Sequence, residues 1–165
     1  MRSPRMIVVL FVRMLISLGV FVAIARLVES SVSVDILIAS YGAMTAVVFG
    51  LEHQQVTRFR NVVGGHLVSA TIGVIVGALV APFSRDLAIV LAVSLAVTAM
   101  VSLGVLHPPG GAVAMVAASA PHVASNKPLL FIFVVATLGA ATYWAIIKVV
   151  GRAFRPLSHG VEPDL

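Results

Sequence analysis

Residues 106–112 read LHPPGGA, and this stretch decides the fold because it interrupts a chain that is otherwise apolar enough to lie in lipid. Its two prolines lack an N–H and cannot continue a helix, but proline suits the first positions of a new helix. Its two glycines allow another group to approach the backbone closely. The pattern predicts a broken helix at membrane depth, with a short new helix over 109–120, an arrangement from which many transporters form a substrate site. The alternative is an ordinary turn between two spans, with His107 at headgroup level.

The composition places the chain in a membrane. Of its 165 residues, 60% are hydrophobic and 10% are charged, and the mean hydropathy is +1.11, whereas a soluble domain carries about 25% charged residues. A net charge of +5 would suggest nucleic acid as the partner of a soluble protein, but these basic residues lie mostly at span ends, where they set topology. We therefore expect the lipid bilayer as partner and no nucleic acid. The absence of cysteine excludes disulfides and thiolate chemistry.

The apolar pattern predicts an all-α, polytopic membrane helix bundle that forms one domain over 1–165. Its two similar halves would each contain a long span, an interrupted short segment and a long span. We expect Asn61 to cap the third span, and Tyr143 and Trp144 to lie near a membrane interface. The predicted segments are 6–27, 34–51, 61–81, 87–106, the short helix 109–120 and 129–150, with 151–165 as a polar C-terminal tail.

The first apolar run allows two interpretations. Residues 23–25 (AIA) resemble the cleavage site of a signal peptide. The run is long, however, Arg13 interrupts it and further spans follow, which favours a retained first helix. Arg13 either snorkels toward the basic side of the membrane, which is the default, or faces the bundle interior.

The topology depends on whether the two short segments cross the membrane. If both cross, there are six membrane segments, and both termini lie on the cytoplasmic side together with Arg58 and Arg60. If both re-enter, four spans remain and these two arginines fall outside, which the positive-inside rule disfavours. An odd number of crossings also inverts the two halves, as in many secondary transporters. A weak internal repeat, which lays residues 41–46 over residues 110–115, agrees with this order.

Small residues recur every four positions in the third predicted span. Such a ridge lets two helices pack closely in lipid, and its main role is architectural. Because a single chain of this length encloses little volume, we also expect a homo-oligomer through the same ridge. The residues concerned are Gly65, Ser69, Gly73 and Gly77.

The polar residues of the two interrupted segments suggest a site for a small anion. A helix N-terminus offers free N–H groups and a partial positive charge, and we expect one at residues 110–113 and a second at residues 42–45. Two histidines near the spans would shape a polar cavity, with one of them linking proton and anion movement. In the alternative, each is a neutral histidine bonded to a backbone carbonyl. The candidate substrate-binding residues are Ser40, Tyr41, Gly42, Asn61, His66, His107, Pro108, Pro109, Gly110 and Gly111.

Three segments carry a resemblance to a known family. The sequences LIASYGA at 37–43, RNVVGGHLVSA at 60–70 and HPPGGA at 107–112 resemble the HPP family of integral membrane proteins. The resemblance implies a membrane helix bundle, usually described with four spanning helices. Members from cyanobacteria and chloroplasts are associated with nitrite transport, and some relatives carry CBS domains. For this chain the resemblance implies a short, stand-alone bacterial form in the inner membrane, with nitrite as the implied substrate.

Other classes of function fit the residues less well. A metal carrier needs a cluster of His, Asp, Glu or Met at depth, and a membrane enzyme needs a nucleophile with a base or paired carboxylates. We expect neither a metal site nor a cofactor nor enzymatic activity. We predict a transporter or channel for a small inorganic anion, and nitrite is one candidate substrate. The alternative is a scaffold or sensor that transports nothing.

Overall fold

The computed structural model describes residues 4–28, 34–52, 54–120 and 128–154, and every regular element in these ranges is helical. The all-α prediction is confirmed to that extent. The elements are α1 (Pro4–Val28), α2 (Val34–Gly50), the short 3₁₀ helix η1 (Gln55–Thr57), α3 (Phe59–Val80), α4 (Arg85–Ser102), α5 (Pro109–Ser119), the π-helical η2 (Leu130–Leu138) and α7 (Gly139–Ala153).

Four helical stretches in the described part of the chain are long and apolar enough to cross a membrane: Pro4–Ile24, Phe59–Val80, Arg85–Ser102 and Leu130–Ala153. A spanning helix needs about 20 residues. At 17 residues α2 is slightly shorter, and at 11 residues α5 is much shorter. The chain is therefore an integral membrane protein with four candidate spans and two shorter helices packed among them.

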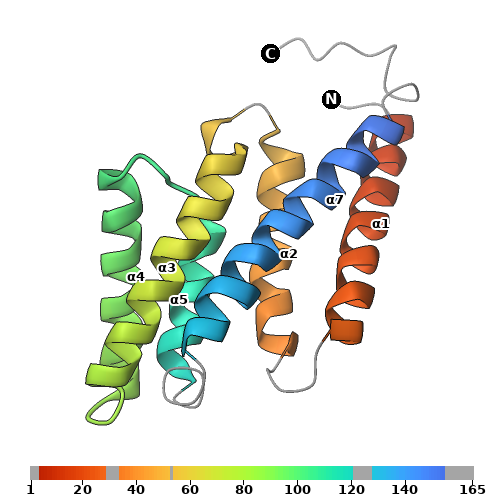
Figure 1. Ribbon diagram of the computed structural model, residues 1–165. Helices are drawn as coiled ribbons and strands as arrows, with labels where there is room; N and C mark the ends of the chain where they lie inside the picture. Colours follow the sequence, from red (N-terminus) through yellow and green to blue (C-terminus); the bar gives the residue numbers. More distant parts are fainter. Residues whose placement is uncertain (1–3, 29–33, 53, 121–127, 155–165) are drawn as a thin grey trace.

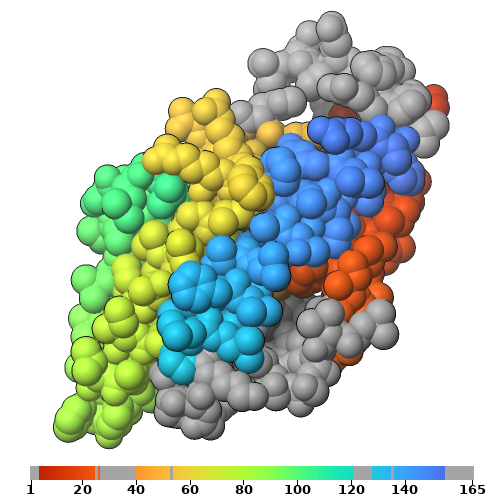
Figure 2. Space-filling model, in the orientation of Figure 1, coloured from red at the N-terminus to blue at the C-terminus, as the bar shows by residue number. Residues whose placement is uncertain are grey.

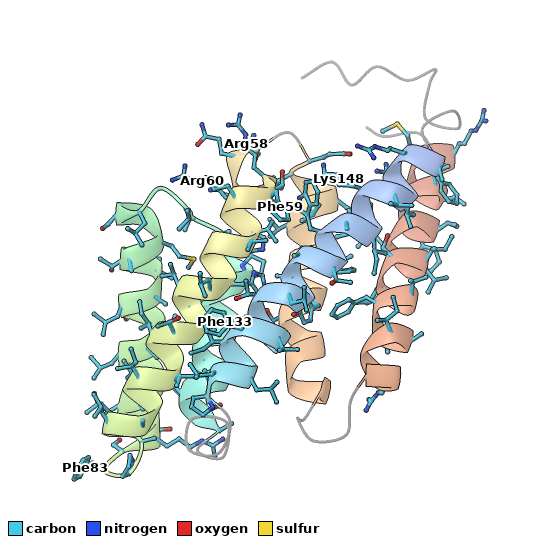
Figure 3. All side chains as sticks on the ribbon, viewed as in Figure 1. Arg58, Phe59, Arg60, Phe83, Phe133 and Lys148 are labelled. Atoms are coloured by element: carbon cyan, nitrogen blue, oxygen red, sulfur yellow. The ribbon has the colours of Figure 1, made fainter. Side chains whose placement is uncertain are left out.

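Successive helices run in opposite directions, as the colour gradient of Figure 1 shows. The start of α1 and the end of α7 lie at the same end of the bundle. Arg58 and Arg60 lie at this end too, and Phe83 lies at the opposite end (Figure 3). The start of α1, the end of α7 and both arginines thus share one end of the bundle, and the crossing of the membrane by both short segments stays a prediction.

The helices form two packed groups. In one, α3 lies against α4 and α5, and in the other the η2–α7 helix lies against α1. Figure 2 shows α3 and η2–α7 side by side on the viewed face, between α4 and α1. The two long helices therefore join the two groups.

The predicted ridge of small residues packs inside the chain. A Cβ added to Gly73 would lie 2.7 Å from both the carbonyl oxygen of Ala114 and the Cβ of Ala117 on α5. Gly65, Ser69 and Gly77 are buried on the same helix. Because α5 covers this ridge, its small residues pack within one chain, and the homo-oligomer stays a prediction.

Two predicted segments differ from the structure at functionally relevant points. The α2 helix is continuous from Val34 to Gly50, so it has no second helix N-terminus at residues 42–45. The α3 helix begins at Phe59 with Arg58 as its N-cap residue. Asn61 therefore lies in the first turn, where it does not cap the helix.

Candidate functional site

The corner after α4 is built by a defined helix ending. Leu103 closes the helix and Gly104 adopts a φ of +64°, a conformation that glycine takes without steric cost. The Gly104 N–H bonds to the Val101 carbonyl at 3.1 Å, and the Val105 N–H bonds to the Met100 carbonyl at 2.9 Å. This pair of bonds is the Schellman ending. The predicted span to residue 106 is therefore too long, since the helix ends at Ser102.

The short helix α5 begins inside the bundle. A Cβ added to Gly65 would lie 2.7 Å from the Cβ of His107. Because Gly65 is six residues along α3, His107 lies about 9 Å below the start of that helix. In Figure 1 the segment that leaves α4 passes behind α3 before α5 begins. The predicted helix break is thus present at this corner, and its depth in a membrane stays a prediction.

The amide groups at the start of α5 are not available to an anion. Pro108 and Pro109 have no N–H. The Gly110 N–H bonds to the His107 carbonyl at 2.9 Å, and the Gly111 N–H bonds to the Pro108 carbonyl at 3.0 Å. The prediction that residues 110–113 offer free amides to an anion is therefore wrong at its first positions.

Gly110 is instead required for close packing. A Cβ at this position would lie 2.7 Å from Ser69 Oγ and 3.0 Å from the carbonyl oxygen of Gly65. The neighbouring Gly111 has much more room, since a Cβ there would meet its nearest atom at 3.9 Å, on Val97. Gly110 thus lets α5 approach α3, whereas Gly111 faces α4.

His107 and His66 lie next to each other in the buried interior. Both side chains are fully buried and their ring centroids are 5.1 Å apart. The Nδ1 of His107 lies 2.7 Å from the Val56 carbonyl oxygen, and the Nδ1 of His66 lies 2.9 Å from the Val62 carbonyl oxygen. Each histidine is therefore held by a backbone carbonyl, as the alternative interpretation of these residues predicts.

The second nitrogen of each ring is different. Among the described residues, Nε2 of His66 and Nε2 of His107 have no hydrogen-bond partner. A buried polar atom without a partner is costly, so such atoms mark sites that bind a ligand or water. The two Nε2 atoms are the clearest sign of a binding function in this region.

Tyr41 of α2 lies next to His66. With His107 these residues begin a row of buried polar side chains, called here the polar row, which consists of His107, His66, Tyr41, Thr45 and Tyr143. The Tyr41 ring is nearly parallel to the His66 ring, with an interplanar angle of 14° and centroids 6.0 Å apart. Its hydroxyl reaches Gly139, where the π-helical η2 gives way to α7. Phe21 of α1 packs on Tyr41 with centroids 4.3 Å apart and separates this row from the lipid-facing side.

Thr45 and Tyr143 extend the row to α7. Thr45 Oγ1 donates to the Tyr41 carbonyl at 2.8 Å. Since its single hydrogen is used there, the bond between the Thr45 and Tyr143 hydroxyls is donated by Tyr143. Tyr143 is fully buried, so its side chain faces the interior of the bundle; its place near a membrane interface stays a prediction.

Two further predicted residues tie the corner to its surroundings. Ser40 Oγ donates to the Pro109 carbonyl at 3.2 Å, and Asn61 Nδ2 donates to the Leu106 carbonyl at 3.1 Å. Three others lie apart from the histidines: Pro108 is exposed, Gly111 faces α4, and nothing lies within 4 Å of a Cβ added to Gly42. Of the ten predicted residues, three lie in the polar row, four bond or pack at the corner, and three lie away from both.

Sequence reasoning missed Thr45 and the role of Tyr143. The spacing of Ala140, Tyr143 and Ile147, all buried in the structure, is the i, i+3, i+7 pattern of one helix face. That pattern was the available signal for an inward-facing Tyr143.

Basic side chains surround the end of the bundle nearest the histidines. Arg58, Arg60 and Lys148 lie toward this end in Figure 3. Arg60 Nη2 reaches the Leu103 carbonyl at 3.4 Å. Trp144 Nε1 donates to the Thr57 carbonyl at 3.0 Å and fastens α7 to η1. The segment that holds His107 is therefore fixed beside a positively charged surface.

Arg13 is largely buried between helices, and its guanidinium reaches toward the end of the bundle where α2 and α7 end, which agrees with snorkelling toward the basic side. Its Nη2 lies 3.6 Å from Glu52 Oε1, and its guanidinium lies over the Phe49 ring, 5.1 Å from the centroid. A Cβ added to Gly151 would lie 3.0 Å from the Arg13 guanidinium, so this glycine leaves room for it.

Comparison with known proteins identifies relatives of the chain. The family described as "HPP, transmembrane region" matches residues 1–157. Two transmembrane proteins of Dictyostelium discoideum are similar to parts of the chain. One is 42% identical over 82 residues, which are 48% of this chain and 26% of that protein. The other is 37% identical over 84 residues, 50% of this chain and 30% of that protein.

The match therefore spans less than a third of the length of these two curated relatives. No solved structure matches the chain.

Proposed function

This chain belongs to the HPP transmembrane family, and we propose that it is a transporter that carries a small inorganic anion across the bilayer. The observation that carries the proposal is the buried polar row formed by His107, His66, Tyr41, Thr45 and Tyr143. Polar side chains are expensive inside a membrane bundle, and in membrane proteins they mark solute and ion pathways. The row links three helices (α2, α3 and α7) and the corner before α5, which suits a path between helices.

The charge of the bundle end supports an anion as the solute. Arg58 and Arg60 lie at the end where His107 is held by the Val56 carbonyl. A cluster of like charges raises the local concentration of ions of opposite sign. Anions gathered there would lie close to the segment that holds His107, the first residue of the polar row.

The orientation follows from the same charges. We propose that the basic end, with the start of α1 and the end of α7, faces the cytoplasm, and that the membrane is a bacterial inner membrane. Nitrite is the substrate that the family resemblance implies. The matched Dictyostelium proteins are named only as transmembrane proteins.

The test is anion uptake by purified protein in proteoliposomes. Nitrite, nitrate, formate and chloride are compared, with protein-free vesicles as the blank. We expect uptake of at least one anion above the blank. Uptake of none of the four would contradict transport and favour the scaffold or sensor function.

Two threonines supply a matched pair of variants. Thr45 and Thr71 each donate to the carbonyl four residues earlier at 2.8 Å, but of these two only Thr45 bonds to Tyr143. We expect Thr45→Val to lower uptake about two- to tenfold, the range of one net hydrogen bond. Thr71→Val should transport like the wild type, and an equal loss in both variants would remove the polar row from the path.

A further inference from the structure

The hydrogen-bond directions at the two histidines fix what their free nitrogens can bind. A carbonyl oxygen only accepts, so the Nδ1 of His66 carries the hydrogen that it shares with Val62, and the Nδ1 of His107 carries the one shared with Val56. In a neutral imidazole the other nitrogen is then an acceptor. Both Nε2 atoms therefore present lone pairs.

Three neighbouring polar side chains each direct a hydrogen to a backbone carbonyl and not to the histidines. The Ser40 hydroxyl donates to the Pro109 carbonyl, and the Asn61 amide donates to the Leu106 carbonyl. The Thr45 hydroxyl donates to the Tyr41 carbonyl. The two Nε2 atoms have no donor among the described residues. A solute that supplies one would remove the cost of leaving them unpaired.

The titratable and charged neighbours do not supply a counter-charge. Tyr41 faces His66 from α2, and Tyr143 packs against Tyr41 from α7. On α3, Arg60 reaches the Leu103 carbonyl. Within the described residues, neither histidine forms an ion pair with an acidic side chain. A solute with a net charge would stay uncompensated at this depth, which is costly in a low dielectric.

A bare anion is therefore a poor ligand for this pair, because its negative oxygens would meet two lone pairs. A weak oxyacid offers an O–H to one Nε2 and adds no net charge. We propose that the His66–His107 pair admits the transported anion only together with a proton, as the conjugate acid of a small weak acid. The proposal rests on the transport function above.

The proton balance is the same in two forms of the bound state. The acid keeps its O–H and donates it to Nε2, or the proton moves from the acid oxygen to Nε2 and leaves an anion beside an imidazolium. In both forms a proton and an anion enter together and the net charge is zero. Anions of strong acids, such as chloride and nitrate, can enter only as the ion pair. They are therefore expected to be the poorer substrates.

The direct test measures the proton that accompanies the anion. Proteoliposomes containing the full chain and an internal pH dye are given formate or nitrite, with the membrane potential clamped. Protein-free vesicles are subtracted, because small neutral acids cross lipid unaided. We expect internal acidification in step with anion uptake, a rate that does not depend on the potential, and slower uptake as the external pH rises. Anion uptake that follows the potential without acidification would overturn the inference but leave transport standing.

Substitutions separate the two ring nitrogens. Asparagine places an amide N–H near the position of Nδ1 and nothing at Nε2, whereas glutamine places its amide near Nε2. We expect His66→Asn and His107→Asn to lose proton-coupled uptake by about tenfold or more, since one unpaired buried group is worth that much. His66→Gln and His107→Gln should recover part of it, and Thr71→Val serves as the control. Melting temperatures in detergent show which variants are folded.

Two results with these variants would overturn the inference. One is wild-type uptake and acidification in folded His66→Asn and His107→Asn proteins. The other is tight binding of Zn²⁺ or Cu⁺ by the wild type that both asparagine variants abolish, because the lone pairs would then serve a metal. If the asparagine variants do not fold, the number of protons that enter with each anion in the wild type decides whether the inference is upheld or overturned. Absence of uptake of every anion would instead contradict the proposed function itself.

Discussion

Ser40 donates its hydroxyl hydrogen to the carbonyl oxygen of Pro109 at 3.2 Å, and the two residues are 69 positions apart in the sequence. The same shift lays residues 41–46 over residues 110–115 in the weak internal repeat. The contact thus ties α2 to the corner that the two prolines form.

The two glycines of the corner should respond differently to alanine. A Cβ at Gly110 meets Ser69 Oγ at 2.7 Å and the Gly65 carbonyl oxygen at 3.0 Å, whereas at Gly111 the nearest atom is 3.9 Å away. We expect Gly110→Ala to lower the free energy of unfolding by about 1–3 kcal/mol, as overpacking does. Gly111→Ala should melt at or above the wild-type temperature in detergent. Equal melting temperatures would contradict the close approach of α5 to α3.

The contact between Tyr41 and Gly139 predicts that substitutions at these two positions have coupled effects on stability. A Cβ at Gly139 collides with the Tyr41 hydroxyl, so Gly139→Ala alone should destabilise the protein by about 1–3 kcal/mol. Adding Tyr41→Phe removes that oxygen and should restore part of the loss. Additive effects in the double variant would show that the two residues do not touch.

Because the ridge of small residues packs inside the chain, we expect Gly73 to be needed for folding of the single chain and not for contacts between chains. Because its backbone lies against Ala114 and Ala117 of α5, Gly73→Val should reduce the yield of folded protein. The oligomeric state of the protein that does fold should not change. Gly19 has nothing within 4 Å of an added Cβ, and Gly19→Val is the control. A folded Gly73→Val protein with fewer subunits by mass measurement would restore the ridge as an oligomer interface.

Arg13 and Glu52 should be coupled in stability. Glu52→Gln removes the carboxylate 3.6 Å from the Arg13 guanidinium, and we expect a loss of about 1 kcal/mol, typical of a partly exposed pair. In the background of Arg13→Met the same change should cost much less. Measured by thermal melting in detergent, an identical cost in both backgrounds would mean that the pair does not interact.

The sequence predicted the helices well and the site less well. Apolar run length decides a membrane helix, so the six segments were found, and the two prolines located the corner. The end of α4 was misplaced because the Gly104 signal was overlooked in favour of the prolines. The break in α2 was wrong because Ser40, Tyr41 and Gly42 resemble a break locally. Their polar groups instead belong to a continuous helix that faces a polar interior.

The remaining features depend on distances between segments far apart in the chain. The spacing of polar residues along one helix cannot show that His66 and His107 have adjacent rings, or that Thr45 meets Tyr143. Nor can it show that the first amides of α5 are already bonded. Because of these contacts, the candidate site consists of the Nε2 atoms of His66 and His107 and not of free amides at the start of α5.

The central claim is that small solutes from water reach the polar interior around the corner, and the absence of cysteine from the chain allows a direct test. Ser40→Cys places a single thiol beside Pro109, and Ala92→Cys places one in the apolar contact of α4. Reaction with a small neutral methanethiosulfonate reagent is measured in proteoliposomes. The account predicts modification of Ser40→Cys that nitrite or formate slows, and none of Ala92→Cys. A Ser40→Cys protein as unreactive as Ala92→Cys would contradict the claim.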